Sequence, residues 1–408
     1  MFRKFISLVL IISLLLSTFV ACNKQDIVDD EKQKDNSKQE SDNQQQDNGD
    51  KQGNENTQKI VGDIKDFEAY RDPQRGRYDF RAKDISNLTM PSLDKFGSFI
   101  LDTQTILPNS FLDTYEKLKN YGRDPGLDVK SLHKDGITGK GVNVAIIDGV
   151  LLKEHNEYKD RIVFYEDLVD NEKAHYHAPM VTSILCGKEA GIAPEAKLYY
   201  VSYINDELQT MEKNEERYDS LAKSIEKIVE INKGLPKDEK IRVLSISSGW
   251  DPAATAIDDA INKAKEDGIF VVTARLYDHD DLYFGGLKRE VLSDPNDINS
   301  YSTLYVDEYD NAEEILFAPM DARWVASHIG IDDYVMYSRG AWSMVVPYIS
   351  GVYTLACQVY PEITPELFWE IALSTGYELE QKNSEFKEKV VKVINPTKLI
   401  EELKNKKN

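Results

Sequence analysis

The sequence predicts an α/β fold in which a mainly parallel β-sheet is flanked by helices. From about residue 128 to the end, short apolar runs typical of strands alternate with helical patterns, and this alternation is the signature of a parallel sheet covered by helices. The 408 residues, 41% of them hydrophobic, are enough for one large domain or two ordinary ones. We therefore expect the main domain over residues 128–408.

Four apolar runs are the expected strands of this sheet. They are residues 142–147, 197–203, 242–247 and 269–273. A helix is expected over about residues 254–265, between the third and fourth runs.

Two more helices are expected from residues that can cap or begin a helix. Between the second and third strands, four apolar side chains fall on one helical face, and Asp219 or Ser220 can cap the start of that helix. The face consists of Leu221, Ile225, Ile228 and Val229. Near the end of the chain, Thr364 is a cap and Pro365 occupies the first turn of another helix.

The first residues have the pattern of an export signal. Arg3 and Lys4 precede an apolar stretch over residues 5–16, which is too short for a confident transmembrane span. The sequence Phe-Val-Ala-Cys that ends at Cys22 resembles the bacterial lipobox, where cleavage exposes a cysteine that receives lipid. We expect a lipoprotein signal peptide over residues 1–21 and anchoring of Cys22 to the outside of a bacterial cell membrane. The alternative is an ordinary cleaved secretory signal followed by an incidental cysteine.

Two segments of different composition precede the main domain. Residues 22–59 consist almost entirely of Asn, Gln, Asp, Lys, Ser and Glu, so they cannot bury enough surface to offset their ordering entropy. We expect a flexible tether there. Residues 60–127 contain apolar side chains without a clean period, and we interpret them as an N-terminal extension packed on the main domain.

Charge and cysteine content exclude some classes of protein. A formal net charge of −21 argues against nucleic-acid binding, because a phosphate backbone would be repelled. Apart from Cys22, only Cys186 and Cys357 are present, both in apolar stretches. The chain is therefore not a disulfide-stapled secreted fold. Buried free thiols are the preferred interpretation, and a single bridge between the two remains open.

The first segment that bears on chemistry ends in a carboxylate. A glycine-rich turn that begins at Gly136 leads into a buried apolar strand ending at Asp148. Open α/β sheets place their sites at the carboxyl ends of strands. A turn-forming or helix-capping role for Asp148 is the alternative.

The second segment is an apolar helix entered through a histidine. His177 begins the helical pattern, and from there its ring can point toward a neighbouring carboxylate. A structurally bonded histidine would have the same pattern. His175 is close by, and only the register of the following helix favours His177.

The third segment places Ser343 at the start of a long apolar helix rich in small residues. Backbone N–H groups at a helix start are unpaired and can stabilise an oxyanion. The alternative is that Ser343 is only the N-terminal cap of this helix.

Together these segments, in the order Asp, His, Ser, resemble the subtilase family. The family's aspartate segment, Gly-x-Gly-Val-x-Val-Ala-Val-Ile-Asp with a following His-Pro element, is similar to the run ending at Asp148 and to residues 155–158. Its Gly-Val-Ala-Pro-x-Ala is matched by residues 191–196, and its Gly-Thr-Ser-Met-Ala-x-Pro-x-Val-x-Gly by residues 341–351. The resemblance covers roughly residues 136–403.

This resemblance implies a subtilisin-like, doubly wound fold and a serine endopeptidase that needs no cofactor. Ser343 would attack a peptide carbonyl, His177 would take and return the proton, and Asp148 would hold the imidazole. Ser247, Ser248 and Gly249 would bind an extended peptide or protein substrate through the main chain.

Some residues depart from the family pattern. Trp342 replaces the small threonine before the nucleophile, and the family's oxyanion asparagine is missing where the chain reads Arg275-Leu-Tyr-Asp-His. Losing such a donor costs about a hundredfold to a thousandfold in turnover. The competing hypothesis is therefore a weak or inactive pseudoprotease that binds peptides or partner proteins through the same groove. A lipoprotein that merely binds a small solute would explain none of the three segments.

One cluster of potential metal ligands is present in the sequence. It consists of Asp278, His279, Asp280 and Asp281. No spaced partner motif accompanies it, so we expect an exposed acidic loop. Structural calcium is common among subtilases, but no calcium site is assigned from this sequence.

Overall fold

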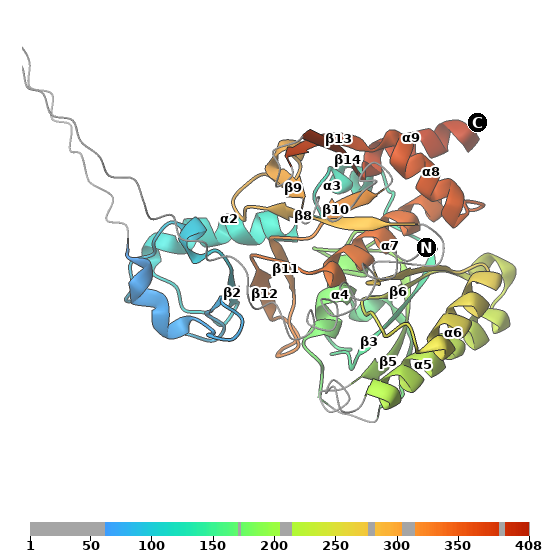
Figure 1. Cartoon of the computed structure of the whole chain (residues 1–408), viewed down its shortest axis with the longest axis horizontal. Helices are drawn as coiled ribbons and strands as arrows, with labels where there is room; N and C mark the ends of the chain where they lie inside the picture. The colour runs from blue at the N-terminus through green and yellow to red at the C-terminus, as the bar shows by residue number, and fades with distance from the viewer. Residues whose placement is uncertain are drawn as a thin grey trace, which may run out of the picture. The chain divides into compact units, whose positions relative to one another are not determined.

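The computed structural model describes residues 62–169, 173–204, 214–275, 282–303, 315–382 and 388–407 (Figure 1). The expected signal peptide, Cys22 and the tether lie outside these ranges. The chain divides into two compact units, one of residues Met1–Tyr78 and Leu88–Gly97, the other of Asp79–Asn87 and Ser98–Asn408.

The described part of the smaller unit is built around three aromatic rings. The 3₁₀ helix η1 (Ile64–Tyr70) is capped by Asp63, whose side chain accepts from the Lys65 N–H. The ring of Phe96, at the end of η2 (Leu93–Phe96), packs edge-on against those of Phe67 and Tyr78, with centroids 5.2 and 5.1 Å away. The short strand β1 (Tyr78–Asp79) lies at the boundary of the two units.

A five-stranded parallel sheet forms the centre of the larger unit, in the order β4-β5-β3-β6-β7. Its strands are β3 (Asn143–Gly149), β4 (Ile162–Asp167), β5 (Lys197–Ile204), β6 (Ile241–Ile246) and β7 (Phe270–Thr273). The four predicted strands are β3, β5, β6 and β7. The first strand of the sheet, β3, lies in the middle; the chain then passes to the edge strand β4, returns to β5 beside β3, and crosses to β6 and β7 on the other side. The predicted doubly wound α/β fold is confirmed.

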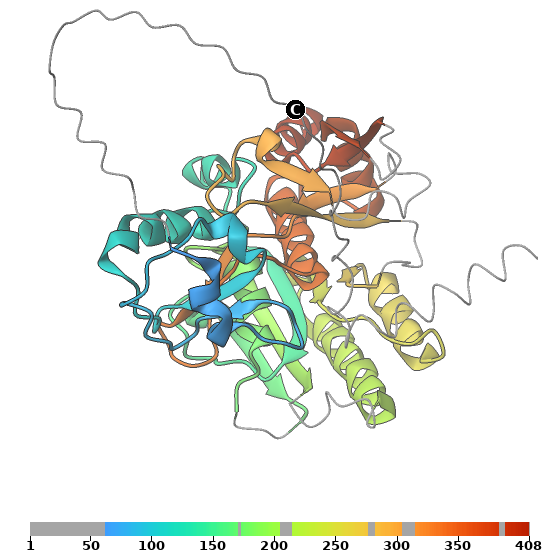
Figure 2. The same cartoon turned by 60° about the vertical axis from the view of Figure 1, so that its left-hand side comes forward.

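Helices cover both faces of this sheet. The helices α4 (His177–Cys186) and α7 (Trp342–Val359) pack together against one face, and α5 (Asn214–Gly234) and α6 (Thr255–Glu266) against the other. Figure 2 shows α5 and α6 side by side. The helix predicted over residues 254–265 is confirmed as α6.

The predicted start of α5 at Asp219 or Ser220 is wrong. The helix already runs from Asn214, so both residues lie within it. The Ser220 hydroxyl donates to the carbonyl of Tyr203 at 2.8 Å, which links α5 to β5 instead of capping a helix start.

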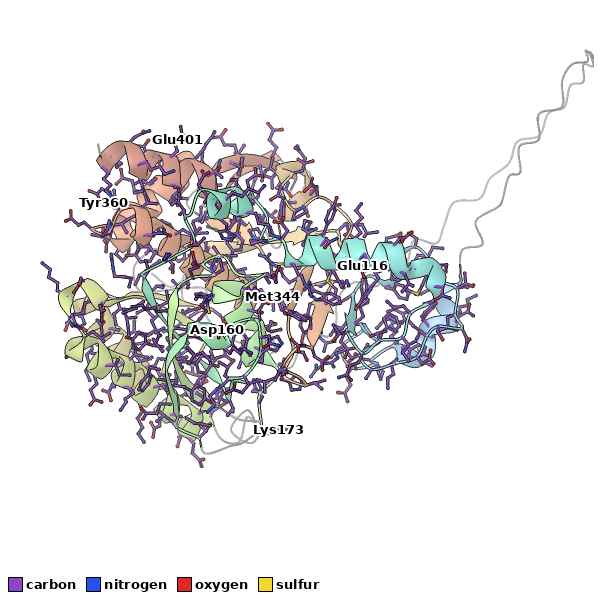
Figure 3. All side chains as sticks on the ribbon, turned by 180° about the vertical axis from the view of Figure 1, so that it is seen from behind. Glu116, Asp160, Lys173, Met344, Tyr360 and Glu401 are labelled. Atoms are coloured by element: carbon purple, nitrogen blue, oxygen red, sulfur yellow. The ribbon has the colours of Figure 1, made fainter. Side chains whose placement is uncertain are left out.

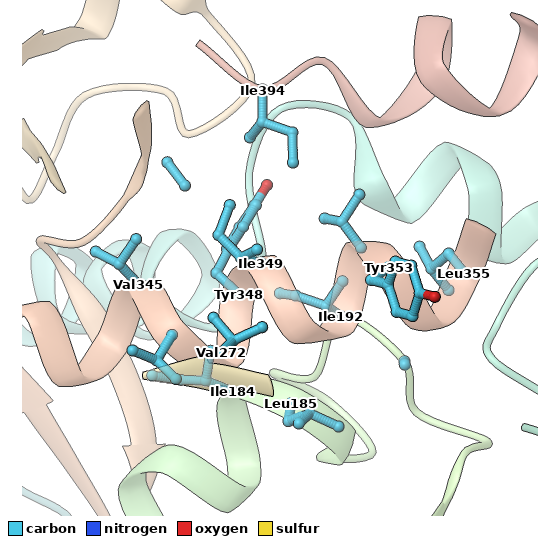
Figure 4. Close-up of a cluster of buried hydrophobic side chains, with 14 of the residues drawn as sticks. Ile184, Leu185, Ile192, Val272, Val345, Tyr348, Ile349, Tyr353, Leu355 and Ile394 are labelled. Carbon is cyan, nitrogen blue, oxygen red and sulfur yellow. The ribbon is translucent and has the colours of Figure 1, made fainter. Parts of the chain in front are cut away.

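The apolar interior of the larger unit is centred on α7 (Figure 4). Tyr348 and Ile349 are fully buried, and Ile192 and Ile394 lie in the same cluster. A Cβ on Gly351 would stand 2.5 Å from the Cβ of Ile192, so only glycine permits this close approach.

Two further sheets complete the larger unit. One has the order β13-β14-β10-β8-β9, and in the other β12 lies between β2 and β11. Their strands are β2 (Phe99–Asp102), β8 (Phe284–Arg289), β9 (Tyr301–Thr303), β10 (Leu316–Pro319), β11 (Arg323–Ala326), β12 (Tyr334–Tyr337), β13 (Tyr377–Lys382) and β14 (Glu388–Val393).

The remaining helices are α2 (Leu112–Arg123), α3 (Val129–Lys134), α8 (Pro365–Thr375) and α9 (Pro396–Lys407). The start predicted for α8 is confirmed, because the Thr364 side chain accepts from the Leu367 N–H and Pro365 is the first helical residue. None of the described helices is both long and apolar enough to span a membrane.

Residues 98–127, which we expected to belong to an N-terminal extension, lie in the larger unit. Strand β2 pairs with β12, and α2 packs on β11. The expected boundaries at residues 59/60 and 127/128 stay predictions.

Cys186 and Cys357 are free and buried, as preferred from the sequence. Burial raises the pKa of each thiol to about 12. Such thiols are inert at neutral pH.

The free energy of unfolding should fall as the pH drops below about 6.5. In the folded chain, Nδ1 of His155 accepts from the Glu157 N–H at 3.1 Å, and Nε2 donates to the carbonyl of Asp333 at 2.9 Å. Burial lowers the pKa of His155, so the unfolded chain binds the proton first and acid favours unfolding.

This effect can be measured by urea unfolding at about pH 7.5 and about pH 5, where His155→Gln should show a smaller pH-dependent loss of unfolding free energy than the wild type. The pKa of buried His133 is lowered for the same reason, so part of the loss should remain in the variant. An identical pH dependence in both proteins would contradict the role of His155.

Candidate active site

Asp148 lies at the carboxyl end of β3 and is almost completely buried. One carboxylate oxygen accepts from the Gly149 N–H at 2.7 Å. Both oxygens lie 2.9 Å from Nδ1 of His177. The alternative turn or cap role therefore accounts for only one contact of this carboxylate, and the imidazole is its main side-chain partner.

His177 is the first residue of α4, as its register predicted. Because Nδ1 faces a buried carboxylate, the proton is on Nδ1 and the lone pair of the neutral ring is on Nε2. The side chain keeps 18% of its surface exposed. The ring is thus oriented so that Nε2, the nitrogen that does not face Asp148, can accept a proton.

His175, the neighbouring histidine, has a packing role that the sequence did not predict. It is buried, and its ring centroid is 6.2 Å from that of His177. A Cβ on Gly149 would stand 2.6 Å from the Cβ of His175. Only glycine at position 149 leaves room for this histidine.

Ser343 lies in the first turn of α7, and two hydrogen bonds connect it to the residue that follows β6. Ala341, with extended backbone, is the N-cap, so the alternative that Ser343 caps the helix is wrong. The Ser343 hydroxyl donates to the carbonyl of Ser247 at 3.3 Å. The Ser247 hydroxyl donates back to the carbonyl of Ser343 at 2.9 Å.

Residues 247–249 follow directly on the end of β6. The Ala274 N–H lies 3.2 Å from the carbonyl oxygen of Ile246 and 3.3 Å from that of Ser248, which holds the inner side of the segment. A Cβ on Gly249 would meet no atom within 4 Å. Ser248 and Gly249 therefore leave room for a chain to approach.

The side chain of Arg275, the second residue after β7, is already engaged. Arg275 forms an ion pair with Asp258 at 2.8 Å and lies over the ring of Trp250 at 5.3 Å. Because these contacts occupy the guanidinium of Arg275, this side chain does not serve as an oxyanion donor. The first-turn N–H groups of α7, including that of Ser343, lack a carbonyl one turn earlier in the helix.

Trp342 is half-buried beside Ser343, and its ring centroid is 6.2 Å from that of Phe284 in β8. Met344 (Figure 3), on the other side of Ser343, is buried, with 2% of its surface exposed. Apolar packing on both sides therefore fixes the turn that carries the serine.

The acidic cluster formed by Asp278, His279, Asp280 and Asp281 lies outside the described residues. Within the described ranges, no three His, Cys, Asp or Glu side chains are grouped so that they could hold a metal ion.

Residues 139–327 match the model of the Subtilase family. Among solved structures, the prenylagaramide maturation protease PagA is 17% identical, with a TM-score of 0.47 over 68% of this chain and 98% of that chain. Fervidolysin from Fervidobacterium pennivorans, a keratinolytic enzyme related to subtilisin, is 14% identical, with a TM-score of 0.50 over 70% of this chain. The match spans 47% of fervidolysin.

The family match includes Asp148 and His177 and ends before Ser343. The likeness to fervidolysin shows the same fold. Residues 139–327, a little under half of the chain, thus resemble the subtilase family of serine peptidases.

Proposed function

We propose that this serine protease is an endopeptidase in which Ser343 is the nucleophile, His177 the general base and acid, and Asp148 the residue that orients the imidazole. The observation that carries the proposal is the contact of His177 Nδ1 with both oxygens of buried Asp148, each at 2.9 Å. This contact fixes the tautomer that leaves Nε2 free to accept a proton.

The proposed reaction proceeds through an acyl-enzyme. Ser343 Oγ forms a bond to the carbonyl carbon of the peptide while its proton passes to Nε2 of His177. The C–N bond then breaks and the imidazolium returns that proton to the leaving amine. Water, deprotonated in turn by His177, cleaves the ester and regenerates Ser343.

Ser343 Oγ must change partner before the attack. In the substrate-free chain it donates to the carbonyl of Ser247 at 3.3 Å, and in the proposed reaction it must leave that carbonyl to donate to His177. Catalytic hydrogen bonds are often looser in a free enzyme than in its substrate complex. The N–H groups at the start of α7 support stabilisation of the oxyanion.

Ser247, Ser248 and Gly249 are proposed to pair with an extended peptide substrate. The space around Gly249 and the continuity of residues 247–249 with β6 support this mode, in which main-chain hydrogen bonds provide the affinity. Outside a bacterial cell, a lipid at Cys22 and the polar tether over residues 22–59 would hold the enzyme near the membrane and leave it able to reach protein substrates.

Labelling with a fluorophosphonate serine-hydrolase probe tests the proposal. We expect purified protein over residues 23–408 to be labelled and Ser343→Ala, with an unchanged melting temperature, to remain unlabelled, because only an activated serine reacts with the probe. The Ser350→Ala variant, which removes a buried hydroxyl of the same helix, is the matched control and should still be labelled.

Well-folded wild-type protein that is not labelled would favour the second candidate, a pseudoprotease that binds peptides through the same groove. The observation in favour of this candidate is the engagement of Arg275 with Asp258 and Trp250, at the place where the family supplies an oxyanion donor.

A further inference from the structure

The four residues 338–341, here called the approach segment, connect β12 to α7 and thus lead directly to Ser343. The carbonyl of Ser338 accepts from the Ala322 N–H at 3.2 Å. The Gly340 N–H donates to Oδ1 of Asp321 at 2.8 Å. Both contacts come from the turn between β10 and β11, so this turn determines where the approach segment runs.

Asp321 is an unusual residue to find in that turn, because only 1% of its side chain is exposed. Burying a carboxylate is costly unless charge and hydrogen bonds compensate for the lost water. Burial raises the pKa of Asp321, while the Gly340 N–H and the guanidinium of Arg339 act in the opposite direction. Both of these compensating groups belong to the approach segment.

The turn that carries Asp321 is itself held firmly. The N–H groups of Met320 and Asp321 both point to the carbonyl of Leu287 in β8, at 3.2 and 3.3 Å. Ala322 has a φ of +60°, a left-handed conformation that a non-glycine residue keeps only when its surroundings hold it. The Asp321 carboxylate thus projects from a fixed point.

Arg339 makes a second link. Its guanidinium donates to Asp321 at 3.1 Å and to Glu290, just after β8, at 2.7 Å. The Glu290 side chain is 63% exposed, so its contact contributes little to stability. The buried contact with Asp321 is therefore the stronger of the two.

The approach segment is also confined by contact. A Cβ on Gly340 would stand 2.2 Å from the carbonyl oxygen of Met320, so the backbone at Gly340 lies directly against the turn. Hydrogen bonds draw the segment to the turn, and close packing sets how near it comes.

We propose that Asp321 is a positioning residue for the nucleophile, holding the approach segment through Gly340 and Arg339 and thereby the first turn of α7, which carries Ser343. This inference rests on the proposed function of Ser343. Asp321 touches neither substrate nor reacting atoms and acts through the main chain three residues before the serine. A displacement of about 1 Å at a reacting atom can cost about a hundredfold in rate.

The test compares Asp321→Leu, which cannot accept a hydrogen bond, with Asp321→Asn, which retains an acceptor for the Gly340 N–H. The readout is the fluorophosphonate acylation rate constant at saturating probe, separated from the probe's binding constant. We expect Asp321→Leu to lower that rate constant by about 10- to 100-fold with little change in probe binding, and Asp321→Asn to restore most of it.

Asp102 provides the matched control. It is a buried carboxylate in β2 whose Oδ1 accepts from the N–H groups of Ala82 and Gln104. We expect Asp102→Leu to lower the melting temperature while the rate constant of the folded protein stays within about twofold of wild type.

The outcomes separate the two hypotheses. Unlabelled wild-type protein would contradict the proposed function. Labelled wild type with equal rate constants in Asp321→Leu and Asp102→Leu would overturn the role of Asp321. If Asp321→Leu does not fold, the Arg339→Gln variant provides the test. We expect it to lower the acylation rate constant by about three- to tenfold. A rate constant equal to that of the wild type would overturn the proposal.

Discussion

Replacing His177 with alanine is expected to lower the acylation rate of Ser343 by about 10⁶-fold. Without the imidazole, no group at Asp148 can accept the serine proton, and the carboxylate loses its partner at 2.9 Å. The rate of fluorophosphonate labelling and the release of acid-soluble peptides from a labelled protein substrate both measure the effect.

His175→Ala is the control for this prediction. His175 lies two residues earlier in the chain and packs against Gly149, so its removal should lower the melting temperature and leave labelling intact. Loss of labelling in His175→Ala together with its persistence in His177→Ala would mean that the base has been assigned to the wrong histidine.

Replacing Asp148 with asparagine is expected to lower the rate by about 10⁴-fold while the fold persists. An amide has nearly the same shape as the carboxylate, but it lacks the charge that stabilises the imidazolium. It can also present an N–H to Nδ1, which would favour the tautomer with its proton on Nε2 and block acceptance of the serine proton. Labelling rates measured across a range of pH check this prediction.

Asp167→Asn is the matched variant for Asp148→Asn. Asp167 ends β4, a strand of the same sheet, and its carboxylate accepts from the Ser202 hydroxyl at 2.7 Å. We expect wild-type labelling from this variant. Equal losses in the two variants would point to the general charge at this edge of the sheet, and the specific role of Asp148 would have to be abandoned.

The strands could be predicted from the sequence because burial on both faces leaves an uninterrupted apolar run. The start of α5 could not, because a capping residue and a polar residue inside a helix have the same local pattern. Ser220 is such a case: its hydroxyl bonds to Tyr203 on a neighbouring strand, and that contact exists only in the folded chain.

In the candidate site, too, local features could be predicted from the sequence, whereas contacts between distant residues could not. Asp148 and His177 follow from a strand end and a helix start, which are local features. The reciprocal hydrogen bonds of Ser247 and Ser343 join residues 96 positions apart. Nothing around Asp321 in the sequence distinguishes it from the many surface aspartates, because its burial is created by two sheets that meet there.

The helix α7 carries Ser343 in its first turn, and its side chains from Met344 to Cys357 are all buried. Most enzymes carry reactive groups on loops that can vary without cost to the scaffold. If Ser343 is the nucleophile, as we propose, the buried scaffold and the reactive group share one helix, so selection for folding and selection for catalysis both act on mutations of α7. Evolution of new specificity must therefore work through the segments around α7 and leave the helix itself nearly unchanged.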